Sequence, residues 1–301
     1  MNREKTIARV TAWGALVNLA LAALKLAAGL LGRSSAMVAD AVHSFSDLVS
    51  DAIVLVMVRV SSKGQDKGHD FGHGKFETLA TVAVAILLFF VGVRLMVGGI
   101  GKIRLVLDGG ELPSPDSIAL WAAVVSIAVK EALYWWTSVT GKKVNSPAMI
   151  SNAWHHRSDA LSSIGSALGI GGAMLLGGKW AVLDPIVGCI ISIFILAVAV
   201  KMVVPALDEL TEGSLPDETE EEIERIICSV DGVENVHELK TRKNGPDIII
   251  AAHIVVNAAM SVAVAHRLTE IAESKLREKF GQKTQISLHV EPDSDINVIE
   301  V

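Results

Sequence analysis

Two pairs of histidine and aspartate share one spacing in this sequence. His43 precedes Asp47 by four residues, and His155 precedes Asp159 by four residues. If both segments are helical, each pair lies on one helix face. Two imidazoles and two carboxylates form a tetrahedral nitrogen and oxygen set, which suits zinc and offers no thiolate to a softer ion. A buried proton relay or a structural polar network is the alternative, and the repeated spacing favours a metal.

A second group of possible ligands lies in the run QDKGHDFGHGKFET. Asp66, His69 and His73 fall within eight residues there, among several glycines. A flexible loop of this kind allows three side chains to converge on one cation. An ordinary solvated loop is the alternative.

The remaining candidates lie near the C-terminus. His237, His253, His266 and His289 account for every histidine beyond residue 207, and Glu291 follows the last of them. Taken singly, each histidine is typical of a protein surface. Taken together, they predict a further metal site, to which His266 is expected to contribute least.

Long apolar runs must position the first two pairs. The chain has 301 residues, 51% of them hydrophobic, and a mean hydropathy of +0.46. A membrane helix needs about 20 apolar residues, and six segments are long enough: 7–31, 35–60, 76–99, 117–139, 149–176 and 182–207. We therefore expect a transmembrane bundle over residues 1–207 and a separate domain over 208–301.

Both histidine–aspartate pairs fall inside these predicted spans, at matching depths. Ionisable residues within a span are costly and so are functional candidates. The span over 35–60 also carries Asp40 and Asp51. These two aspartates are expected to line an access path or to face water in a cavity.

Basic residues near the ends of the spans predict the orientation. Nine lie on one side (Arg3, Lys5, Arg9, Arg59, Lys63, Lys67, Lys75, Lys142 and Lys143) and four on the other (Arg33, Lys102, Arg104 and Lys179). The positive-inside rule then places both termini in the cytoplasm. The net charge of −6 and the acidic run over 216–224 argue against a nucleic-acid surface. Cys189 and Cys228 form no recognisable thiolate metal site.

The pattern changes beyond residue 207. We expect an acidic amphipathic helix over 216–230, strands over 233–242 and 247–256 on either side of a turn over 243–246, a second helix over 261–280 and a third strand over 284–290. This αββαβ order predicts a small α+β domain with helices packed on a sheet.

Several motifs together resemble those of the cation diffusion facilitators. They are His43-Ser44-Phe45-Ser46-Asp47, Phe71-Gly72-His73-Gly74-Lys75, His155-His156-Arg157-Ser158-Asp159, Leu215-Pro216-Asp217 and His237-Glu238-Leu239-Lys240-Thr241-Arg242. The resemblance covers almost the whole chain. It implies a homodimeric exporter, not an enzyme, with a metallochaperone-like cytoplasmic domain.

The resemblance also implies a role for every histidine except His156. His43, Asp47, His155 and Asp159 match the transport site of the family, and Asp66, His69 and His73 match its loop site. His237, His253, His266 and His289 match its cytoplasmic site, with Glu291 in place of a common aspartate. Lys75 matches a basic residue that pairs with an acidic one after the sixth span, here Glu212.

These observations predict a proton-coupled antiporter that exports Zn²⁺ by alternating access. Some bacterial members have aspartate where this chain has His43, and those also accept cadmium. The expected setting is the lipid bilayer of a bacterial inner membrane, with the protein as a homodimer. Export of Cd, Co, Mn or Fe, or a membrane-anchored sensor or scaffold, are the alternatives. A metalloprotease is not supported because the sequence has no HExxH run.

Overall fold

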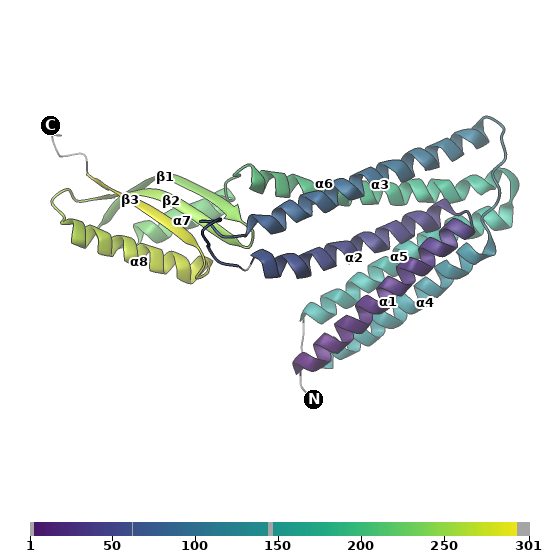
Figure 1. The fold of residues 1–301 in the computed structure, drawn as a ribbon, viewed down its shortest axis with the longest axis horizontal. Helices are drawn as coiled ribbons and strands as arrows, with labels where there is room; N and C mark the ends of the chain where they lie inside the picture. The colour runs from purple at the N-terminus through teal and green to yellow at the C-terminus, as the bar shows by residue number, and fades with distance from the viewer. Residues whose placement is uncertain (1–2, 62, 144–146, 294–301) are drawn as a thin grey trace. The chain divides into compact units, whose positions relative to one another are not determined.

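The computed structural model describes residues 3–61, 63–143 and 147–293. Within them the chain forms six long helices and then a small α+β domain (Figure 1). The long helices are α1 (Arg3–Leu31), α2 (Ser35–Ser61), α3 (Lys75–Leu107), α4 (Ser117–Lys143), α5 (Pro147–Leu176) and α6 (Leu183–Leu210), with a short 3₁₀ helix η1 (Gly178–Val182) before α6. The domain comprises α7 (Asp217–Cys228), β1 (Val233–Asn244), β2 (Asp247–Val256), α8 (Val262–Phe280) and β3 (Gln285–Pro292). The predicted fold class is confirmed.

Five of the six predicted spans lie within one long helix each, and the sixth begins one residue before α6, at the last residue of η1. Among the described residues, five helical segments are long and apolar enough to cross a membrane. These five correspond to α1, α3, α4, α5 and α6. Helix α2 is not among them; it is 27 residues long and carries three aspartates and an arginine.

Helix α3 is longer than the sequence pattern predicted. The predicted span ended at Gly99, whereas the helix continues to Leu107. A glycine ends a helix only where the backbone turns left-handed. That happens at Gly109, whose φ is 85°, and the N–H of Gly110 closes the last turn on the carbonyl of Leu105 at 2.8 Å.

Small residues bring the helices of the bundle close together. One buried cluster joins four helices through Ala28 of α1, Ala36 and Met37 of α2, Ala119, Ala122 and Ala123 of α4, and Ile170 of α5. Alanines at such contacts let helix backbones approach closely, which replaces the hydrophobic driving force that is missing in lipid. The larger apolar side chains, such as Phe90 and Leu168, are exposed, as expected of a lipid-facing surface.

One carboxylate holds the start of α2. Asp184, at the beginning of α6, is 2% exposed and accepts hydrogen bonds from Ser34 Oγ at 2.5 Å and from the backbone N–H of Ser35 at 2.6 Å. The N–H of Ala36 also points to it, at 3.3 Å. A negative charge here satisfies donors that a helix start leaves unpaired and complements the helix dipole.

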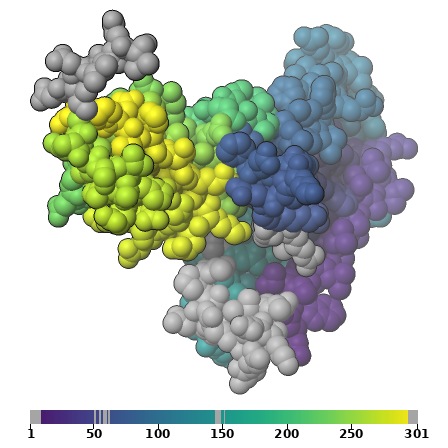
Figure 2. Space-filling view, turned by 60° about the vertical axis from the view of Figure 1, so that its left-hand side comes forward, coloured from purple at the N-terminus to yellow at the C-terminus, as the bar shows by residue number. Residues whose placement is uncertain are grey.

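The C-terminal sheet has the order β1-β2-β3, with β1 and β2 antiparallel and β2 and β3 parallel. Ile250, Ala252, Ile254 and Val256 of β2 are buried against α7 and α8 in one hydrophobic core. Because side chains alternate along a strand, the intervening residues of β2, including His253, face the other side. Figure 2 shows α8 and β3, yellow-green to yellow, on the surface of this domain.

The loop between α2 and α3 docks on the turn between β1 and β2. The carbonyl of Phe71 accepts hydrogen bonds from Asn244 Nδ2 at 2.7 Å and from Gln285 Nε2 at 3.0 Å. Gly74 and Gly245 meet backbone to backbone, so that a Cβ on Gly74 would lie 2.2 Å from the carbonyl oxygen of Asn244. Glycine is therefore required at this contact.

We predict that Asp184→Ala lowers the thermal unfolding midpoint of the purified protein. The change removes the cap of α2 and leaves buried donors unpaired, which typically costs about 0.5–2 kcal/mol. Differential scanning fluorimetry in detergent measures this shift, with Asp108→Ala, an exposed loop aspartate, as the control. Equal midpoints for the two variants would contradict the capping role.

Candidate metal centres

The first centre lies between α2 and α5. His43, Asp47 and Asp159 each offer a ligand atom, and these three atoms lie within 4.8 Å of one another. His155 stands at the margin, with Nε2 3.9 Å from Asp159 Oδ2 and its side chain 48% exposed. The structure thus brings together three of the four predicted ligands and places the fourth within reach. Together with His155, the group would offer two imidazoles and two carboxylates.

A lysine that the sequence analysis did not single out occupies this centre. Lys130 of α4 places its Nζ 2.6 Å from Asp159 Oδ2, and the two side chains are only 3% and 8% exposed. The available signal was a lysine in the middle of the apolar run of α4, followed directly by Glu131, because a charge inside a span is costly unless it is paired.

A second buried lysine pairs with Asp40. Lys25 of α1 lies 2.9 Å from Asp40 Oδ2, and it also donates to Ser163 Oγ at 2.9 Å and Ser44 Oγ at 3.1 Å. Asp40 is 1% exposed. The expectation that Asp40 faces water is therefore wrong, because the side chain is buried and its carboxylate is paired with Lys25. The side chain of Asp51 lies outside the described residues.

His156, the histidine left without a role, is buried beside this region. It is 2% exposed, and neither ring nitrogen has a hydrogen-bond partner among the described residues. It follows His155 directly in α5, so its ring leaves the helix at a different angle. The structure does not bring it into the group formed by His43, Asp47 and Asp159.

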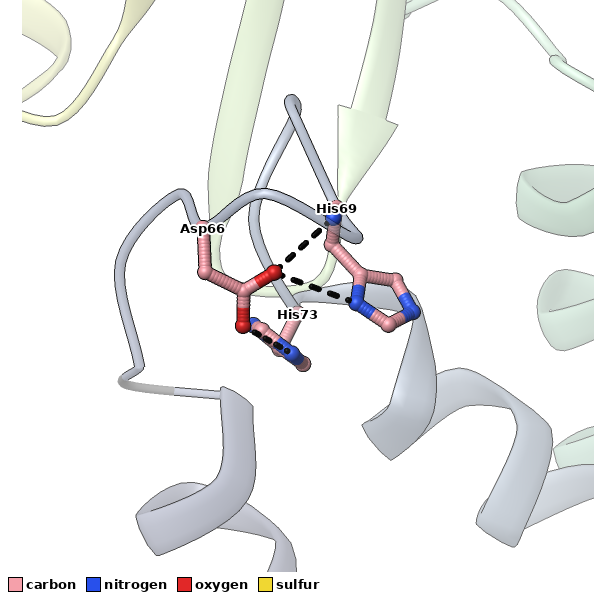
Figure 3. Close-up of side chains that lie close together, drawn as sticks. All are labelled: Asp66, His69 and His73. Atoms are coloured by element: carbon pink, nitrogen blue, oxygen red, sulfur yellow. Dashed lines mark hydrogen bonds and ion pairs between the residues drawn. The ribbon is translucent and has the colours of Figure 1, made fainter.

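The second centre is the loop between α2 and α3 (Figure 3). Asp66 Oδ1 lies 3.6 Å from His69 Nδ1, and Asp66 Oδ2 lies 3.4 Å from His73 Nε2. The ring centroids of the two histidines are 4.3 Å apart. His73 Nδ1 lies 3.3 Å from the carbonyl of Gly64; donation of its proton there would leave Nε2 free to bind a cation. All three predicted loop residues converge.

Backbone N–H groups hold the carboxylate of Asp66 in place as a possible metal ligand. Its Oδ1 accepts the N–H of Gly68 at 2.8 Å and the N–H of His69 at 2.9 Å. These hydrogen bonds, that from Gly68 first, hold the pKa of the Asp66 carboxyl below its usual value. The carboxylate therefore stays ionised and available as a ligand across the neutral pH range.

The third centre is a row of histidines on the open face of the sheet. His237 and His289 are the register partners of His253 on either side. Glu291 lies 3.0 Å from His237 Nε2, 2.8 Å from His253 Nδ1 and 3.8 Å from His289 Nε2. The hydrogen bond to His253 and the neighbouring histidines lower the pKa of Glu291. The acidic residue that replaces the common aspartate is thus in place.

His266 and Glu238 depart from what the sequence predicted for this centre. His266 lies on α8 and pairs with Glu270 at 3.6 Å, so within one chain it does not join the row. Glu238, not predicted as a ligand, lies 3.8 Å from His253 Nε2. A regular strand would turn Glu238 away from His237, but the ladder is irregular here and Glu238 has a φ of +47°. Strand periodicity alone could not reveal that turn.

Comparison with known proteins follows the same division of the chain. A profile described as the cation efflux transmembrane domain matches residues 12–211, and one described as the cytoplasmic domain of cation efflux proteins matches residues 215–293. The chain belongs to the cation efflux family. Members of this family, the cation diffusion facilitators, are transporters and not enzymes. The cytoplasmic domain is the dimerisation domain of the family and implies a homodimer.

Several relatives cover most of this family member. The manganese efflux system protein MneP of Bacillus subtilis is 30% identical over 96% of this chain and 97% of its own length. Metal tolerance protein C1 of Arabidopsis thaliana is 33% identical over 93% of this chain, which spans only 61% of that protein. A solved structure of a putative zinc transporter, CzrB in its zinc form, is 34% identical over 28% of this chain and 96% of its own, with a TM-score of 0.26.

The predicted partners Lys75 and Glu212 meet in this transporter, and a third residue joins them. Lys75 and Arg242 both donate to the carboxylate of Glu212. The hydrogen bond from Lys75, then that from Arg242, lower the pKa of Glu212. The pairs are therefore complete above the usual pKa of a glutamate and are lost only as the pH falls through the lowered value.

We predict that the charge swap Lys75→Glu with Glu212→Lys restores only part of the stability lost in Lys75→Glu. The new lysine at 212 would face Arg242, and exposed pairs are each worth about 0–1 kcal/mol. Adding Arg242→Glu should recover more. Thermal midpoints of the wild type and of the single, double and triple variants measure this order. Full recovery by the double variant would show that Arg242 does not share Glu212.

Proposed function

We propose that this protein exports Zn²⁺ from the cytoplasm in exchange for protons, by alternating access. The observation that carries the proposal is the convergence of His43, Asp47 and Asp159 within 4.8 Å between α2 and α5, with His155 beside them. Two imidazoles and two carboxylates, with no thiolate, match the ligands and geometry of zinc. The two ionised carboxylates would offset the charge of a desolvated dication.

The histidines supply the coupling to protons. Zinc binds only to neutral imidazole, so protonation on the outer side would favour release of the ion. Histidine titrates close to the working pH, so that a modest proton gradient is sufficient to reload the site with protons. The two carboxylates keep the site attractive to a cation during the return to the cytoplasmic side.

Manganese is the second candidate, because a full-length relative carries the name of a manganese efflux protein. Mn²⁺ favours carboxylate, carbonyl and water ligands, whereas two imidazoles suit zinc better. The ligand set therefore favours zinc, and a direct comparison of ions decides between them.

The loop and the sheet are proposed as further metal sites on the cytoplasmic side. Asp66, His69 and His73 would bind one cation, and the row of His237, His253, His289 and Glu291 would bind others across the homodimer. We place both termini in the cytoplasm of a bacterium, in agreement with the basic residues at the span ends. Metal at these sites would report the cytoplasmic zinc concentration to the transporter.

We predict that Asp159→Ala abolishes zinc uptake into proteoliposomes. Loss of residues that merely support a metal ligand costs about 10–100-fold, so loss of a ligand should cost at least the upper end of that range. A zinc-sensitive dye and a pH-sensitive dye inside the vesicles report both ions, and Asp108→Ala is the control. The wild-type protein should take up Zn²⁺ faster than Mn²⁺. Near-normal uptake by Asp159→Ala would exclude the site, and preference for Mn²⁺ would exclude zinc as the main substrate.

We also predict that zinc raises the melting temperature of the cytoplasmic domain from Pro216 onward, which has its own hydrophobic core. At a zinc concentration about 100 times Kd the stabilisation is about 2.7 kcal/mol. The shift should shrink as the pH falls through the histidine range. His237→Ala with His253→Ala should remove it, Glu238→Ala should reduce it, and His266→Ala should leave it unchanged. Absence of any shift at neutral pH would make these histidines structural.

A further inference from the structure

A cavity of about 460 Å³ opens in the membrane bundle between the α1–α2 connection, α3 and α6. Its lining includes three basic residues, Arg33, Arg94 and Lys102, and no acidic residue. All three are exposed. Among the described residues no carboxylate forms an ion pair with Arg33 or Arg94, and Lys102 donates only to Ser35 Oγ, at 2.7 Å. The cavity therefore concentrates positive charge that the described part of the chain does not neutralise.

Arg94 is the residue that most requires a partner. It lies within a helix apolar enough to cross a membrane, five positions inside the end of the predicted span at Gly99, or ~8 Å along the helix. A charged side chain at that depth is costly unless it pairs or reaches the interface. Since Lys102 lies two turns further along the same helix, an anion between them would be contacted from both sides.

Apart from Ser34 and Ser35, the rest of the cavity lining is apolar or glycine. Val38, Val91 and Leu95 line it, and Gly98 leaves room where a side chain would otherwise stand, because a Cβ there meets no atom within 4 Å. An apolar wall below a cluster of basic groups fits a molecule with an acyl chain and an anionic head. A small inorganic anion would leave the apolar wall without a partner.

We propose that this cavity binds an anionic membrane lipid, with its phosphodiester between Arg33, Arg94 and Lys102 and one acyl chain along Val91 and Leu95. The C-terminal domain is cytoplasmic and follows α6, so the start of α6 and the cavity beside it belong to the outer leaflet. Bound lipid would neutralise the basic groups and hold the α1–α2 connection against α3. This inference is independent of which cation is transported.

The test measures lipid binding to the full-length protein in detergent by native mass spectrometry, with phosphatidylglycerol, phosphatidylcholine and inorganic phosphate as three separate probes. The wild type should retain phosphatidylglycerol in preference to the other two. Arg94→Gln should weaken this binding about fivefold, the effect of one basic residue on an anionic lipid. Gly98→Leu, which fills the cavity, should weaken it further.

Two matched controls lie on the same helix and outside the cavity. Arg104→Gln removes a basic residue, and Gly101→Leu adds a side chain where a Cβ also meets no atom within 4 Å. Neither should change phosphatidylglycerol binding. Equal weakening by Arg104→Gln, equal retention of phosphatidylcholine, or binding by Gly98→Leu as tight as that of the wild type would each overturn the proposal. Retention of phosphate alone would also overturn it.

A different observation carries a second inference, which rests on the proposed function. Lys130 lies 2.6 Å from Asp159, a proposed ligand, and both are buried. A metal ion that binds Asp159 must displace this ammonium group. We infer that Lys130 is a resident counter-ion, which occupies Asp159 when the site is empty and helps to expel the metal when the site opens outward.

The transport half-saturation constant KM tests this role, because a merely structural lysine would change the amount of active protein and not KM. Lys130→Met frees Asp159 and should lower KM for zinc about tenfold or more, the scale of one close charge pair, while the maximal rate falls. Lys130→Arg, which can pair with the carboxylate through two parallel hydrogen bonds, should raise KM. Glu131→Gln is the control; it removes a charge next to Lys130 on α4, where Glu131 is half-buried and pairs with Arg157 at 3.7 Å rather than with Asp159.

Unchanged KM in both Lys130 variants would overturn this inference and leave the proposed function intact. Failure of the proposed function is a separate result, namely normal uptake by Asp159→Ala. If Lys130→Met does not accumulate in the membrane, Lys130→Arg still tests the inference. A KM of Lys130→Arg at or below that of the wild type would contradict competition between Lys130 and the metal for Asp159.

Discussion

Charge inside an apolar bundle is stable only beside an opposite charge or a polar partner, and most of the membrane part of this protein follows from that constraint. Asp40 lies against Lys25 and Asp159 against Lys130, with every one of these side chains less than a tenth exposed. Asp184 instead accepts from the start of α2. Among the described carboxylates of α2 and α5, Asp47 forms no ion pair with a lysine, and it lies close to Asp159, where His43 and His155 also lie.

Asp40 and Asp47, both on α2, differ in what surrounds them. Asp40 is fixed by Lys25 and the serines around it, so it holds α1, α2 and α5 together. Asp47, one heptad further along, has His43 at 4.0 Å and Asp159 nearby. Similar carboxylates on one helix face therefore differ in role because of what α1 and α4 place opposite them. Coulomb attraction in a low-dielectric interior is strong enough to make that distinction.

Local spacing predicted much of this arrangement. The four-residue interval from His43 to Asp47 and from His155 to Asp159 was enough to place each pair on one helix face, and the short interval from Asp66 to His73 was enough for the loop. What spacing could not predict depends on tertiary contacts. The position of Lys130 against Asp159 requires the packing of α4 on α5, and Glu238 reaches His253 only because the strand is irregular.

Because the α2–α3 loop docks on the C-terminal domain, the boundary of that domain does not match a single break in the sequence. The carbonyl of Phe71 in this loop accepts hydrogen bonds from Asn244 at the β1–β2 turn and from Gln285 at the start of β3, and Gly74 packs tightly against Gly245. An exposed glycine-rich loop is ordinarily an easy target for proteases, but this one is part of a folded substructure. The cytoplasmic module is thus discontinuous in sequence. A chimera that exchanges only the C-terminal domain would separate that domain from the α2–α3 loop on which it docks.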